Sequence, residues 1–156
     1  MNRFSLTRQM AHAVAALTIL GLGLPASAAP PVPFRGRADL VVTGQEFLPP
    51  ASLRLTGSAT GQATHLGRFT RTETIVVDLT NGTFTGTLVF TAANGDRLTA
   101  DVAGHFTSPH LDAAEGTYVF TGGTGRFHNA SGQAAFEAKA VGPGAFDVKF
   151  NGTIQY

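Results

Sequence analysis

The chain of 156 residues contains no cysteine. It can form no disulfide, so a domain of this size has to be stabilised by a hydrophobic core. The same absence excludes a thiol nucleophile and a lipid anchor attached to an N-terminal cysteine. A serine nucleophile is equally unsupported, because the chain has no Gly-x-Ser-x-Gly elbow.

Charge is scarce too, since Asp, Glu, Lys and Arg make up 13% of the chain. The formal net charge of +1 becomes −1 when an N-terminal segment carrying Arg3 and Arg8 is removed. A near-neutral chain offers no electrostatic basis for binding nucleic acid. Metal-ligand spacing is also missing, because a Ser-Pro break separates His105 from His110. We therefore expect no metal, no cofactor and no nucleic-acid partner.

The N-terminus has the three parts of a secretory signal peptide. Arg3 and Arg8 precede an apolar run over residues 11–24, and an Ala-Ser-Ala pattern follows at residues 26–28. The run is shorter than the roughly 20 residues of a transmembrane span, which leaves an uncleaved anchor as the alternative. We predict cleavage near Ala28–Ala29, a periplasmic or extracellular bacterial protein, and no membrane span after cleavage. The expected segments are a signal peptide at 1–28, a Pro-rich lead-in at 29–33 and one folded domain at 34–156.

Helical periodicity is absent after the lead-in, and alternation of apolar and polar residues takes its place. Residues 84–92, FTGTLVFTA, show the period-2 pattern of a strand with one buried and one solvated face. Asn-Gly pairs at residues 81–82 and 94–95 predict hairpin turns between such runs. Eight or nine antiparallel strands imply a sandwich or a closed barrel, and a barrel leaves no unpaired edge. The expected strands cover residues 35–44, 52–60, 62–70, 72–80, 83–92, 96–107, 115–121, 132–141 and 145–155.

Residues 121–132, TGGTGRFHNASG, combine four glycines with a basic residue. A P-loop ends in Gly-Lys-Ser/Thr, and a dinucleotide-binding loop opens a helix. This stretch does neither, and a turn between strands presents no helix N-terminus to a phosphate. We therefore expect its glycines to turn the chain and Phe127 to pack into one end of the barrel.

The same stretch resembles the GGTG-x-F-x-x-A-x-G signature of the allene oxide cyclase and dirigent protein superfamily. GGTGRF at residues 122–127 carries it, with Ala130 and Gly132 completing it. Residues 63–70, ATHLGRFT, are similar to a segment of secreted bacterial relatives to which no activity is attached. The resemblance implies an all-β fold, a calycin-like, eight-stranded antiparallel β-barrel with an apolar interior. Plant members rearrange a fatty-acid epoxide or steer coupling of phenoxy radicals, but no catalytic residue aligns here, so none is carried over.

Polar residues inside such a barrel are the candidates for chemistry, because an unpaired charge there is costly. If one strand runs unbroken from Ala63, its inward face carries His65, Phe69, Arg71 and Glu73. A break at Gly67 or Arg68 would instead turn Leu66 inward. The alternation around Tyr118 also directs its hydroxyl inward. The candidate catalytic residues are His65, Glu73 and Tyr118, and the candidate ligand contacts are His65, Arg71, Tyr118, Phe90, Phe106 and Phe120.

Three functions fit these residues. The leading hypothesis is an exported barrel whose Phe-rich interior binds an apolar small molecule. The second is a cofactor-free isomerase or cyclase, which needs only an apolar cavity with polar groups that stabilise developing charge. The third is a structural or interaction barrel with a filled core, for which a homo-oligomer remains open. Alternation shows which way side chains point but not how fully they fill the interior, so it does not separate the three.

Overall fold

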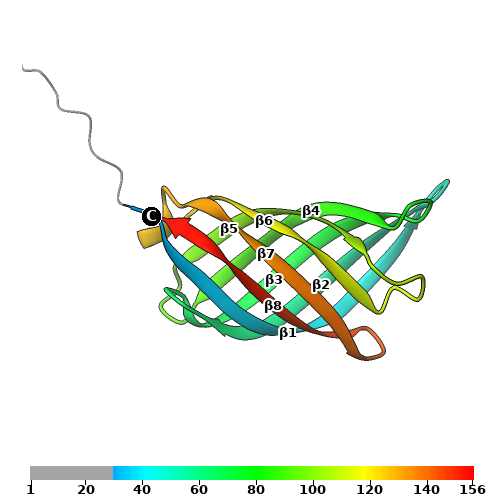
Figure 1. Cartoon of the computed structure of the whole chain (residues 1–156), viewed down its shortest axis with the longest axis horizontal. Helices are drawn as coiled ribbons and strands as arrows, with labels where there is room; N and C mark the ends of the chain where they lie inside the picture. Colours follow the sequence, from blue (N-terminus) through cyan, green and yellow to red (C-terminus); the bar gives the residue numbers. More distant parts are fainter. Residues whose placement is uncertain (1–29) are drawn as a thin grey trace, which may run out of the picture.

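The computed structural model describes residues 30–156, so the signal peptide expected at 1–28 lies outside the described residues. Eight antiparallel strands form a closed barrel in which each pairs with its neighbour in the chain and β8 pairs with β1 (Figure 1). The eight-stranded antiparallel barrel is therefore confirmed. Its elements are β1 (Val32–Leu48), β2 (Ser52–Ala63), β3 (Gly67–Asp78), β4 (Thr83–Ala92), β5 (Arg97–Phe106), β6 (Ala113–Gly123), η1 (Gly125–Phe127), β7 (Ser131–Gly142) and β8 (Ala145–Gln155).

Alternation sends successive side chains into and out of the barrel. On β5, Leu98, Ala100 and Val102 are buried, while Asp101 and Ala103 are exposed. The interior therefore holds the apolar set that the pattern predicted. Among the described residues, no helix is long and apolar enough to cross a membrane.

The strand boundary that we expected between residues 70 and 72 does not exist. β3 runs without a break, and the hairpin turn before it lies at residues 64–66. His65 and Gly67 both have a φ of 66°, the left-handed conformation that reverses the chain in tight hairpins. The nine-strand alternative is wrong, because two of its strands are one.

The two ends of the barrel differ. The turns β1–β2, β3–β4, β5–β6 and β7–β8 lie at one end, which we call the open end. The C-terminus and η1 lie at the other, the closed end, on the left of Figure 1. There Phe127 is fully buried, and its ring centroid is 5.1 Å from that of Tyr156. The sequence-based expectation that Phe127 packs into one end of the barrel is confirmed.

The glycine-rich stretch closes this end through its backbone. Gly125 has a φ of +57° and Gly132 a φ of +120°, values that other residues rarely adopt. A Cβ atom on Gly125 would also overlap the carboxylate of Asp96. These residues are needed for the turn into η1 and the entry into β7, as the motif predicted.

A layer of phenylalanine rings fills the half of the interior next to the closed end. The centroids of Phe34 and Phe120 are 4.8 Å apart, and those of Phe69 and Phe90 are 5.1 Å apart. Phe150 stacks on Phe34 at 5.4 Å. Each fully buried ring stabilises the fold by roughly 1.5–3 kcal/mol, so this aromatic core accounts for much of the stability of a chain without disulfides.

Candidate functional site

A cavity of about 70 Å³ lies between the aromatic core and the open end. Its position follows from the strands that line it, since Phe106 ends β5 and Ala114, Phe84 and Phe146 lie near the starts of β6, β4 and β8. Most of its wall is apolar, and Arg71 and Glu73 are the only charged residues of the described range 30–156 that line it. The lining residues are Leu40, Val42, Leu55, Thr56, Gly57, Arg71, Glu73, Ile75, Phe84, Val102, Phe106, Ala114, Tyr118, Phe136, Ala138, Phe146 and Val148.

Arg71 lies at the boundary between the aromatic core and this cavity. Its guanidinium carbon is 5.8 Å from the ring centroid of Phe90 and 5.7 Å from that of Tyr118. Nη1 donates a hydrogen bond of 2.9 Å to the hydroxyl of Tyr118, and Nη2 lies 2.7 Å from a carboxylate oxygen of Glu73. The aromatic faces and the two oxygens together stabilise a charge that is almost fully removed from water.

Alternation on β3 explains why Arg71 and Glu73 lie together. They are two residues apart on one strand and therefore point to the same face. Gly57 is the cross-strand partner of Glu73 on β2, and a Cβ on it would lie 3.2 Å from the Cγ of Glu73. This glycine leaves the space that the carboxylate occupies. A glycine inside a strand often marks such a close approach.

Tyr118 completes the group from β6, on the opposite side of the barrel. Its ring stacks on Phe136, with centroids 4.5 Å apart and planes 10° apart. Burial raises the pKa of Tyr118 to about 12, although the positive charge of Arg71 acts in the opposite direction. Burial alone would lower the pKa of Arg71, but Tyr118 and Glu73 outweigh it and the pKa is raised. At neutral pH Arg71 is therefore a guanidinium and Tyr118 a neutral phenol.

Two hydrogen-bond donors of this group have no acceptor among the described residues. Arg71 Nε is buried and, among residues 30–156, has no hydrogen-bond acceptor. The hydroxyl of Tyr118 accepts from Nη1, and no described residue accepts its proton in return. A buried donor without an acceptor costs about 1–3 kcal/mol, so an oxygen atom that reached either donor from the cavity would be stabilised.

His65 does not belong to this group, which corrects the expectation of an unbroken inward face. It lies in the β2–β3 turn at the closed end, where its ring is 3.0 Å from both the carbonyl oxygen of Pro33 and the hydroxyl of Tyr156. Leu66 is buried in its place. The reason is the turn itself, since the left-handed conformation at His65 ends the alternation that β3 resumes after Gly67.

The other predicted contacts divide between the two halves of the interior. Arg71, Tyr118 and Phe106 line the cavity, as does the candidate acid or base Glu73. Phe90 and Phe120 belong to the aromatic core and are not among the residues that line the cavity. They can affect a bound molecule only indirectly, as Phe90 does by contacting the guanidinium of Arg71.

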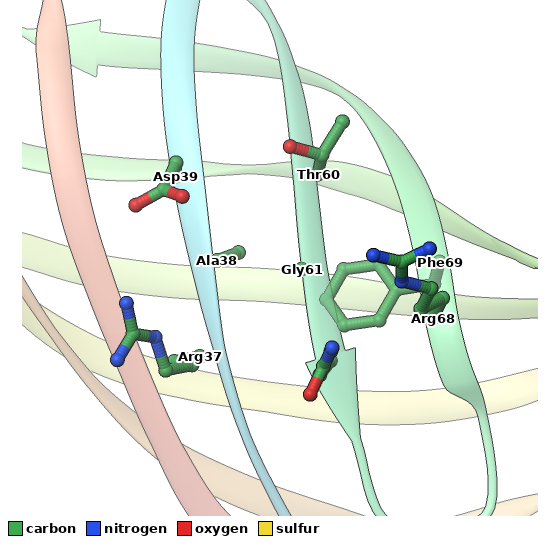
Figure 2. A pocket seen from close by; sticks show the side chains of 8 residues that line it. Arg37, Ala38, Asp39, Thr60, Gly61, Arg68 and Phe69 are labelled. Atoms are coloured by element: carbon green, nitrogen blue, oxygen red, sulfur yellow. The ribbon is translucent and has the colours of Figure 1, made fainter.

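A second hollow lies on the outer wall, over β1, β2 and β3 (Figure 2). Arg37 and Arg68 lie on either side of Gly61, and Asp39 and Thr60 lie along the same strands. The charged side chains are exposed, so water satisfies them without a ligand. Within the described chain, no group of three His, Asp or Glu residues is placed to hold a metal ion. The interior cavity is therefore the candidate functional site.

No family model matches the chain, and the search of curated proteins finds no match either. The chain's own residues therefore carry the functional inference.

Proposed function

We propose that this barrel binds a small, mostly apolar molecule in the cavity, with a polar end of the molecule against Arg71 and Tyr118. The observation that carries the proposal is a buried arginine with an unpaired Nε at the base of an apolar cavity. A core built only for stability would lose little by replacing both members of the Arg71–Glu73 pair with apolar side chains. Retention of the charge together with its empty neighbouring space favours a binding role.

The shape of the cavity bears on the kind of ligand. Pockets for drug-sized molecules measure about 300–1,000 Å³, so a cavity of about 70 Å³ accommodates only one end of such a molecule. Each turn at the open end presents an exposed apolar side chain on or next to it: Phe47, Leu79, Leu111 and Val141. We propose that the remainder of an elongated ligand lies among these side chains, which we call the rim.

The resemblance to allene oxide cyclases and dirigent proteins supports the same proposal. The glycine-rich motif turns the chain at the closed end of an eight-stranded barrel, and this barrel is the fold that the resemblance implies. We propose accordingly that the chain is a calycin-like member of that superfamily. With the N-terminal pattern of residues 1–28, it would bind its ligand in the periplasm or outside the cell.

Two measurements test the binding function. Native mass spectrometry of protein purified from its source would show an added mass that unfolding releases. Ala138→Leu fills the cavity, and the matched control Ala135→Leu adds the same volume on the exposed face of β7. We expect Ala138→Leu to lose the added mass and Ala135→Leu to retain it. A wild-type protein without bound or acquired ligand would instead point to a structural barrel.

A second candidate is a cofactor-free isomerase or cyclase at the same site. The observation that favours it is the position of Tyr118 and Arg71, two donors that could stabilise negative charge developing on a substrate oxygen. Arg71→Met and Tyr118→Phe would then lower the turnover number more than they weaken binding. Mass spectrometry can follow the bound molecules over time. If they bind but are not converted, the enzymatic candidate is excluded.

A further inference from the structure

We infer that the cavity selects molecules whose polar end is uncharged and accepts hydrogen bonds, such as a ketone, an aldehyde or an ester, over carboxylates and ammonium ions. This inference rests on the proposed binding function and deepens it by assigning the ligand class. It follows from the balance of charge and of hydrogen-bond donors at the base of the cavity.

The charge at the base is balanced internally. The guanidinium of Arg71 lies 2.7 Å from the carboxylate of Glu73, and their side chains are only 1% and 13% exposed. Because Glu73 neutralises Arg71, a carboxylate ligand would meet as much repulsion as attraction while losing its hydration. An ammonium ligand would be attracted by Glu73 and repelled by Arg71 to a similar extent, and it would lose its hydration as well. In the part of the chain that the structure describes, no other charged residue lines the cavity to compensate either ion.

The donors at the base are in excess. Arg71 has five N–H bonds, and the structure provides acceptors to Nη1 and Nη2 but none to Nε. Tyr118 uses a lone pair of its hydroxyl to accept from Arg71, so its own proton is available. A carbonyl oxygen has lone pairs and no proton, so it can accept from one of these donors without placing another proton against them. Satisfying buried donors with an uncharged acceptor also avoids the desolvation of an ion.

The apolar wall reinforces this selection. Above the base, the cavity is lined by side chains such as Leu55, Ile75, Val102 and Val148. They favour an alkyl chain or a ring and offer no hydrogen bond to a second polar group. The ligand that fits has one uncharged acceptor at its end, followed by an apolar body.

Three probes with the same chain length test the inference: 2-octanone, octanoate and octylammonium. Their dissociation constants are measured by titration calorimetry at neutral pH with the mature protein. We expect the wild-type protein to bind 2-octanone at least about tenfold more tightly than either ion. Glu73→Gln removes the neutralising charge, so octanoate should gain about tenfold or more and become the preferred probe. The control Glu137→Gln removes an exposed charge from the outer wall and should leave the order unchanged.

If circular dichroism shows that Glu73→Gln is unfolded, a second variant takes its place in the test. Tyr118→Phe keeps the ion pair and removes one unpaired donor, so the preference for 2-octanone over octanoate should fall several-fold. A wild-type preference for octanoate, or a preference unchanged in both Glu73→Gln and Tyr118→Phe, would overturn the inference while leaving the binding function intact. Binding of no probe by the wild-type protein or by Glu73→Gln would refute the binding function itself, and the inference with it.

Discussion

Removing one partner of the Arg71–Glu73 pair should destabilise the fold, and the loss should depend on which partner is removed. We expect Glu73→Met to cost more than Arg71→Met, and the double variant to cost least. The structural reason is the difference in exposure, since the side chain of Arg71 is 1% exposed and that of Glu73 is 13% exposed. A carboxylate left alone could regain some hydration through the open end, whereas a guanidinium left alone could not.

The magnitudes follow from general costs of breaking a buried pair. Glu73→Met leaves a buried charge that keeps its hydrogen bond to Tyr118 and its contacts with aromatic rings but has no counterion, which costs about 3–5 kcal/mol. Arg71→Met leaves a partly hydrated carboxylate and also removes the unpaired Nε, which lowers the cost to about 1–3 kcal/mol. The double variant replaces both charges by apolar side chains of similar length and should lie within about 1 kcal/mol of the wild type. The coupling energy between the two sites, taken as the two single losses combined less the loss in the double variant, is then about 5–6 kcal/mol.

The assay is urea unfolding followed by far-ultraviolet circular dichroism, because the chain has no tryptophan to report by fluorescence. The exposed pair Arg54 and Glu46, with side chains 44% and 60% exposed, serves as the control. Arg54→Met and Glu46→Met should each change stability by less than about 1 kcal/mol. A larger loss for Arg71→Met than for Glu73→Met, or a double variant as unstable as the two losses combined, would refute the reasoning.

Other parts of the structure give further predictions. In a Tyr156→Phe background, tyrosinate absorbance should report Tyr118 titrating near pH 12, whereas unfolded tyrosine titrates near 10. The contribution of Tyr118 to stability should therefore be complete below about pH 10 and be lost, by up to about 3 kcal/mol, as pH rises through 12. Phe127→Ala should cost about 3–5 kcal/mol in urea unfolding, since this fully buried ring closes the barrel. Gly125→Ala should lower the melting temperature, because a φ of +57° and overlap with Asp96 both oppose the new methyl group. An unchanged melting temperature would show that the turn can rearrange.

The fold was predictable because alternation and turn signals agree along most of the chain. β4 and β5 are joined where Asn94-Gly95 predicted a hairpin, and Gly95 has a φ of 88°. The turn at residues 64–66 was not recognised, because Thr64 and His65 give no strong turn signal. Its one local clue was Gly67, whose positive φ follows the turn.

The candidate site was only partly predictable. Alternation along the strand that follows the turn correctly predicted that Arg71 and Glu73 point into the barrel. It could not place Arg71 against Tyr118, because that contact crosses the barrel between residues 47 positions apart. Nor could it separate Phe106, which lines the cavity, from Phe120 in the aromatic core, since a period of two carries no information about depth along the barrel axis.

The closed end has a kinetic consequence for the proposed ligand. Phe127 and the aromatic core fill the barrel below Arg71, so a molecule that enters between the turns of the open end has to leave by the same passage. Association and dissociation then share one transition state. A substitution that narrows the passage slows both by the same factor and leaves the equilibrium affinity unchanged. Rim residues such as Phe47 and Val141, at the mouth of this passage, would therefore set the rates of entry and exit in addition to contacting the bound ligand.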